Sequence, residues 1–88
     1  MDRFVWDEAK NAENIRIRGI SFAIVHEFDW DNAVFQDDSR FEYGERRIRA
    51  FNRIDGKPYC VVFTPRDGTL RIITVRRMHD KEARDYDI

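Results

Sequence analysis

The sequence has few of the residues on which several common protein chemistries depend. It contains one cysteine and two histidines, and they show no metal-ligand spacing, so a zinc site is not expected. A single cysteine cannot form an internal disulfide. The patterns G-x-x-x-x-G-K-[ST] and G-x-G-x-x-G are absent, which excludes the usual phosphate-binding loops. We therefore expect a protein that uses neither a metal nor an organic cofactor.

Long apolar runs are also missing. The longest one covers residues 60–63, whereas about 20 apolar residues are needed to cross a bilayer. The N-terminus lacks the basic-then-apolar order of a signal peptide. We expect a cytoplasmic protein without a membrane partner, in which Cys60 is a buried thiol.

Charged and aromatic residues are abundant, at 38% and 14% of the chain. This composition favours a folded core over intrinsic disorder. The net charge of −1 hides an asymmetry, because residues 1–39 carry a net −5 and residues 40–84 a net +6. Ten of the twelve basic residues in the second segment are arginine, whose rigid guanidinium group binds phosphate in a bidentate manner. The basic half suits either a polyanionic ligand or a solvated, ion-paired surface.

Local signals predict two helices near the N-terminus. Asp7 is the expected N-cap of a helix over residues 8–18, and Gly19 is its expected C-cap. Ser21 is the expected cap of a shorter helix that ends near residue 28. The apolar contacts of the first helix are predicted at a spacing of three residues, at Trp6, Ala9, Ala12 and Ile15.

From residue 33 the pattern changes to strands, which are predicted over residues 33–35, 46–54, 59–64 and 70–77. Alternation along residues 46–54 places Ala50 and Phe51 on opposite faces. Asp55 and Gly56 predict a tight hairpin, and residues 65–68 predict the next turn. Residues 4–6 are expected as a short strand or an extended lead-in.

We expect one domain over residues 1–88 with an α+β fold. Its two N-terminal helices should pack on one face of a three- to four-stranded antiparallel meander, with a short C-terminal helix over residues 79–86. The other face of the sheet should stay partly open, and functional residues are expected there.

Arginines on the predicted strands are the main candidates for chemistry. RNA cleavage needs a group that accepts the 2′-hydroxyl proton, one that stabilises the negative phosphorane and one that protonates the leaving 5′-oxygen. Arginine suits the second task. Tyr43 and Tyr59 are candidates for base stacking, and Glu45 or a tyrosine hydroxyl is a candidate for proton transfer. The alternative is that the arginines on these strands only keep the surface soluble and take no part in catalysis.

Two other polar features are interpreted as structural. The adjacent carboxylates Asp37 and Asp38 would point to opposite faces of a strand, so they could not share a site and are interpreted as turn formers. His26 lies beside apolar residues of the second predicted helix. His79, which follows the last predicted strand, is more interesting because of its position.

Short segments spread over most of the chain follow one another in a specific order and spacing, although none is specific alone. They cover residues 4–11, 13–16, 19–22, 37–40, 43–46, 56–59, 62–68 and 70–77. In this arrangement the sequence resembles the BrnT family of type II toxins, which have the RelE-like ribonuclease fold.

The resemblance implies an endoribonuclease that cleaves RNA without a metal or cofactor and inhibits translation. It also implies neutralisation by a BrnA-like ribbon-helix-helix antitoxin, with operator DNA contacted only through that antitoxin. Carried onto this sequence, the catalytic candidates are Arg76, Arg77 and Glu45. The substrate-binding candidates are Arg18, Arg53, Arg66 and Tyr43.

One departure from the family pattern bears on activity. The first helix usually ends with Lys-His-Gly, but here the residues are Ile17, Arg18 and Gly19. A histidine can transfer a proton near neutral pH, whereas an arginine stays charged. Either Glu45 or His79 transfers the proton instead, or the chain is a weak or inactive binding module that serves as antitoxin ligand and operon co-repressor. A third hypothesis is electrostatic RNA binding without cleavage. If the usual lysine and histidine only cap the end of the helix, Arg18 can fill that role equally well.

Overall fold

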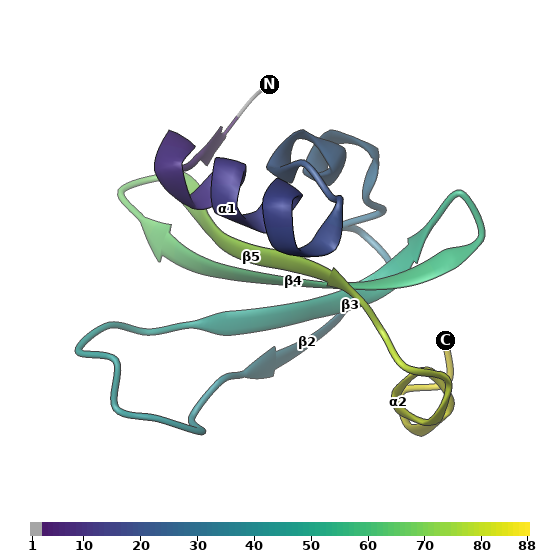
Figure 1. Ribbon diagram of the computed structural model, residues 1–88. Helices are drawn as coiled ribbons and strands as arrows, with labels where there is room; N and C mark the ends of the chain where they lie inside the picture. The colour runs from purple at the N-terminus through teal and green to yellow at the C-terminus, as the bar shows by residue number, and fades with distance from the viewer. Residues whose placement is uncertain (1–2) are drawn as a thin grey trace.

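Residues 3–88 are described by a computed structural model, in which one five-stranded sheet carries helices on both faces (Figure 1). The strand order is β1-β5-β4-β3-β2. The strands are β1 (Phe4–Val5), β2 (Val34–Asp37), β3 (Ile48–Ile54), β4 (Lys57–Arg66) and β5 (Thr69–Arg77).

The antiparallel meander predicted from the sequence is present as β2 to β5. The structure corrects its size, because β1 adds a fifth strand that runs parallel to β5. Phe4 and Val5 pair there with Leu70 and Arg71. The sheet is therefore mixed rather than purely antiparallel. Because this pairing joins distant parts of the chain, no local turn signal in the sequence predicts it.

Two hairpin turns set the register of the meander. Asp55 and Gly56 have φ of 53° and 79°, and Asp67 and Gly68 have φ of 46° and 80°. Positive φ at both central residues is what a two-residue hairpin of the primed type requires. The second turn is tighter than predicted, because Pro65 and Arg66 still belong to β4.

The two N-terminal helices begin at the predicted caps. Asp7 accepts a hydrogen bond at 2.8 Å from the backbone N–H of Ala9 and starts α1 (Glu8–Arg18). Ser21 caps the second helix, η1 (Phe22–Glu27), which is a 3-10 helix. Within residues 3–88 no helix is long and apolar enough to span a membrane.

The contacts of α1 differ from the prediction. Of its four predicted apolar contacts, Trp6 packs against the core, whereas Ala9, Ala12 and Ile15 are exposed. The buried residue is Asn14, whose Nδ2 donates to the carbonyl of Val75 at 3.0 Å and to that of Ile20 at 2.9 Å. The helix is therefore fastened along β5 by amide hydrogen bonds rather than by an apolar stripe.

Each face of the sheet carries its own apolar cluster. The larger one lies under η1 and contains Phe22, Val25, Phe28, Ala50, Ile54, Val61, Phe63, Ile72 and Val75. The smaller one contains Phe51, Cys60, Val62, Ile73, Met78 and Ala83, the last of which belongs to α2 (Asp80–Asp85). Ala50 and Phe51 thus lie on opposite faces, as the alternation predicted. Figure 1 shows α2 on the side of the sheet away from α1.

Candidate phosphate-binding site

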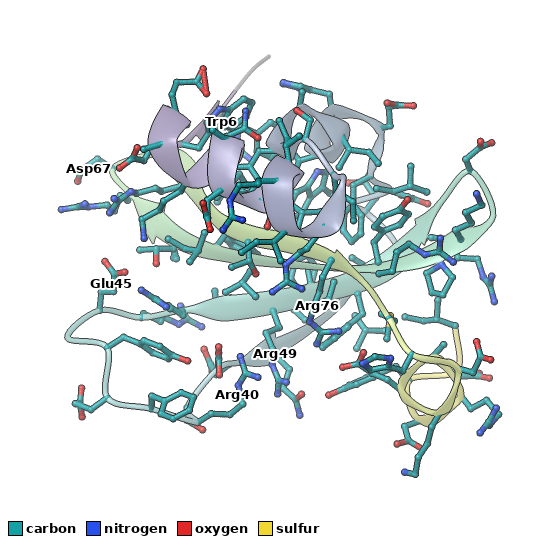
Figure 2. The ribbon with its side chains drawn as sticks, in the orientation of Figure 1. Trp6, Arg40, Glu45, Arg49, Asp67 and Arg76 are labelled. Carbon is teal, nitrogen blue, oxygen red and sulfur yellow. The ribbon has the colours of Figure 1, made fainter. Side chains whose placement is uncertain are left out.

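Four arginines gather on the sheet face that carries α2, and we refer to them together as the arginine face: Arg40, Arg47, Arg49 and Arg76. Figure 2 shows Arg40, Arg49 and Arg76 on the side away from α1, between the loop of residues 38–47 and α2. All three act electrostatically on the buried thiol of Cys60. Burial nevertheless raises the pKa of that thiol to about 11, so it carries no charge near neutral pH.

Arg76 is held by a carboxylate from α2. Its Nη1 and Nη2 donate to the two carboxylate oxygens of Glu82 at 2.8 and 2.9 Å. Both side chains are about one-fifth exposed. The hydrogen bonds raise the pKa of Arg76 and lower that of Glu82, so the pair stays ionised. A bidentate pair of this kind fixes the direction of the guanidinium group.

Arg40 belongs to the loop of residues 38–47, which is fastened by Asp38. The Nε and Nη2 atoms of Arg40 donate to this carboxylate at 2.7 and 2.9 Å, and the hydroxyl of Tyr43 does so at 3.3 Å. The hydrogen bonds from Arg40 lower the pKa of Asp38 to about 2. The backbone N–H of Asp38 also donates to the carbonyl of Arg47. Asp38 is thus a buried anchor that closes the loop, beyond the turn-forming role predicted for it.

Arg47 lies beside three residues nominated from the sequence, which are Glu45, Tyr43 and Arg18. Its Nε donates to Glu45 at 3.3 Å, and its guanidinium carbon lies 3.9 Å from the ring centre of Tyr43. It also lines a hollow of about 340 Å³ together with Ile17 and Arg18 of α1. The two positions that depart from the family pattern therefore lie beside the arginine face.

Arg49 differs from the other three because no carboxylate within residues 3–88 pairs with it. Its Nη2 donates to Oε1 of Gln36 at 2.9 Å, and its guanidinium carbon lies 5.6 Å from the ring centre of Phe51. Its Nε is buried and has no hydrogen-bond partner among the described residues. Arg49 lies on a predicted strand and so belongs to the candidate arginines, but it was not among the individually nominated residues. Its shared face with Phe51 was the available signal.

Three nominated residues lie elsewhere. Arg77 follows Arg76 on β5, but its guanidinium carbon lies 5.4 Å from the ring centre of Tyr59, which packs on the cluster under η1. Arg76 and Arg77 therefore point to opposite faces of the sheet. Arg53 donates to a carbonyl in the hairpin at one end of β4, and Arg66 ends the same strand at the other.

The arrangement can bind and neutralise phosphate, because guanidinium groups are permanently charged and present several donors in a fixed geometry. His79 caps α2, and its backbone N–H donates to Glu82 at 3.4 Å. Among the residues that the structure describes, no three His, Cys, Asp or Glu side chains are placed to hold a metal ion.

Comparison with known proteins decides the family. Residues 6–82 match the family model described as the ribonuclease toxin BrnT of type II toxin–antitoxin systems. The chain belongs to the BrnT family. Membership confirms the resemblance noted in the sequence, and a type II family implies an antitoxin partner for this BrnT-family chain.

A solved BrnT structure has the same fold. The 1.1 Å crystal structure of the Brucella abortus ribonuclease toxin BrnT matches with a TM-score of 0.70. The match covers 91% of this chain and 100% of that chain, at 24% sequence identity. A search of curated protein sequences gives no match.

Proposed function

We propose that this BrnT-family chain is a cytoplasmic endoribonuclease that cleaves RNA without a metal, inhibits translation and is neutralised by a ribbon-helix-helix antitoxin. The proposal is supported most by the arginine face, where the guanidinium groups of Arg40, Arg49 and Arg76 lie on the side of the sheet away from α1. Such a set suits the phosphates of RNA and the extra negative charge of a phosphorane.

Within this function, Arg76 contacts the scissile phosphate and stabilises the phosphorane. Its bidentate contact with Glu82 fixes the guanidinium group before RNA arrives, which reduces the reorganisation needed in the transition state. Glu45 accepts the proton of the attacking 2′-hydroxyl, and Arg47 holds the Glu45 carboxylate in place. Oε2 of Glu45 receives the Arg47 hydrogen bond, so Oε1 is left to take the proton. The P–O5′ bond breaks, and the leaving 5′-oxygen takes a proton from solvent water.

Base stacking is assigned to the loop of residues 38–47. Tyr43 and Tyr59 were the nominated residues. One face of the Tyr43 ring is covered by the Arg47 guanidinium group, and Tyr59 packs on the cluster under η1. Phe41 contacts the ring of Tyr43 at a centroid distance of 5.9 Å and is 69% exposed. Phe41 therefore offers the freer ring for an unstacked RNA base.

The test is to incubate purified, antitoxin-free protein with a structured RNA and to determine the ends of the products. Attack by the 2′-hydroxyl leaves a 2′,3′-cyclic phosphate, and Arg76→Ala should abolish these products. Expression without the antitoxin should also stop growth, and co-expression of the antitoxin should restore it. Absence of cleavage by a sample shown to be folded would contradict the proposal.

The second candidate is a catalytically weak binding module that acts as antitoxin ligand and co-repressor. It is favoured by the position of Ile17 and Arg18, which line the hollow beside Arg47 where the usual family pattern has lysine and histidine. In that case the protein binds its antitoxin tightly and cleaves RNA at no pH. The double substitution Ile17→Lys with Arg18→His should then create cleavage.

A further inference from the structure

Arg49 is the member of the arginine face that forms no direct ion pair within residues 3–88. On the arginine face, Arg40 pairs with Asp38, Arg47 with Glu45 and Arg76 with Glu82, at N–O distances of 2.7, 3.3 and 2.8 Å respectively. Arg49 has no such pair within residues 3–88, and its Nε is buried without a hydrogen-bond partner there. A buried, unsatisfied donor of a charged group costs stability, so its presence calls for an explanation.

The guanidinium group of Arg49 is nevertheless held in place. Oε1 of Gln36 accepts hydrogen bonds from Arg49 and from the hydroxyl of Tyr86. The ring of Tyr86 in turn stacks on Phe51 at a centroid distance of 4.1 Å. The direct contacts of the Arg49 guanidinium group are therefore with neutral groups, which position the cation without forming an ion pair.

The neighbours of Arg49 increase the attraction for an anion. Arg40 acts on Arg76 so as to lower the pKa of that guanidinium group, which is the mark of like-charge repulsion. Arg49 also attracts the carboxylate of Asp38, whose pKa it helps to lower, but that carboxylate is bound directly by Nε and Nη2 of Arg40. An anion placed among these cations would relieve their mutual repulsion.

From this geometry we propose that Arg49 is a second phosphate-binding residue, which holds an RNA backbone phosphate next to the one at Arg76. The inference rests on the proposed ribonuclease function and adds to it a contact beyond the scissile phosphate. A polynucleotide presents phosphates in series, whereas free phosphate would occupy one position.

The experiment measures binding separately from cleavage. A short single-stranded RNA with 2′-O-methyl groups cannot be cut through its 2′-oxygens, and its affinity is measured over a range of salt concentrations. Losing one phosphate contact should reduce the slope of log affinity against log salt by about 0.7. We expect this change for Arg49→Gln, together with a loss of affinity of about 10- to 100-fold at low salt.

Two further variants separate charge from geometry. Arg49→Lys keeps the positive charge but loses the planar guanidinium group that binds phosphate in a bidentate manner. It should therefore retain the slope of log affinity against log salt and lose part of the affinity. The matched control is Arg16→Gln on α1, where an exposed arginine pairs with Glu13, and it should change neither quantity. Inorganic phosphate should compete weakly with the RNA, because it cannot bridge two positions.

Thermal unfolding tests whether Arg49 is structural instead. Because its Nε is unsatisfied, Arg49→Met should leave Tm unchanged or raise it. A large fall in Tm with an unchanged salt slope for Arg49→Gln would overturn the proposal. So would weaker antitoxin binding with unchanged RNA affinity, since Arg49 would then serve the protein partner. If the unsubstituted protein cleaves RNA but the slope is unaffected, the inference fails alone. If it binds no RNA at all, the proposed function fails with it.

Discussion

Replacing Asp38 with asparagine would remove the charge that fastens the loop of residues 38–47 while keeping the shape of the side chain. Hydrogen bonds from Arg40 lower the pKa of Asp38 from 3.8 to about 2. A difference of this size corresponds to about 2 kcal/mol of folding stability. The Arg40 side chain is 52% exposed, so solvent screening reduces the contribution to about 1–2 kcal/mol. Asp38→Asn should therefore lower Tm by about 5–15 °C near neutral pH.

The stability difference between the unsubstituted protein and Asp38→Asn should depend on pH. Because the pKa is lower in the folded protein, the stabilisation is complete above 3.8 and is lost as the pH falls toward about 2. Urea unfolding of both proteins over a pH series should show a gap near neutral pH that closes in acid. The control is Asp37→Asn, which affects an exposed pair with Arg46 and should cost less than about 0.5 kcal/mol. A gap for Asp38→Asn that persists unchanged at about pH 2 would refute the reasoning.

Three other outcomes are expected. Asn14→Ala should lower the free energy of unfolding by about 2–3 kcal/mol, because the two hydrogen bonds of the buried Asn14 side chain are lost. Ile15→Ala, at a 45% exposed position, should lower it by less than about 0.5 kcal/mol. Equal effects of the two substitutions in urea unfolding would contradict the described contacts of α1. Glu82→Gln should destabilise by about 1–2 kcal/mol in the same assay, since it removes the charge paired with Arg76, and no change would show that α2 is held by apolar contacts alone. A thiol-reactive dye should label Cys60 slowly in the native protein, because burial raises its pKa to about 11, and quickly in denaturant; fast native labelling would contradict its burial.

Much of the fold follows from signals between residues close in the chain. Asp55 and Gly56 adopt the positive φ angles that a two-residue hairpin needs, and Asp7 and Ser21 accept the predicted capping hydrogen bonds. Alternation along β3 correctly separated Ala50 from Phe51. Each of these rules involves only neighbouring residues, so the sequence contains all the information that they require.

The remainder depends on contacts between distant segments. The apolar periodicity of α1 predicted Ile15 as a contact, but a hydrogen bond from Asn14 to Val75 decided which side faces the sheet. The parallel pairing of β1 had no local signal at all. The arginine face forms because β3, β5 and the loop of residues 38–47 converge, so its members could not be brought together before the strand order was known.

The candidate site shows the same division. The alternation rule that separated Asp37 from Asp38 applies equally to Arg76 and Arg77, yet the sequence analysis nominated both of these arginines together. Glu45 and Tyr43, in contrast, were nominated separately and meet at Arg47. Their proximity comes from the closed loop, which Asp38 holds.

The most direct test of an active centre on the arginine face compares Arg76→Ala with Arg77→Ala in single-turnover RNA cleavage. The two residues are adjacent in sequence and share the same chemistry, but they lie on opposite faces of the sheet. With both variants shown to be folded, Arg76→Ala should lower the rate by about 100- to 1000-fold, whereas Arg77→Ala should stay close to the unsubstituted protein. Equal losses for the two variants, or a larger loss for Arg77→Ala, would contradict an active centre on the arginine face.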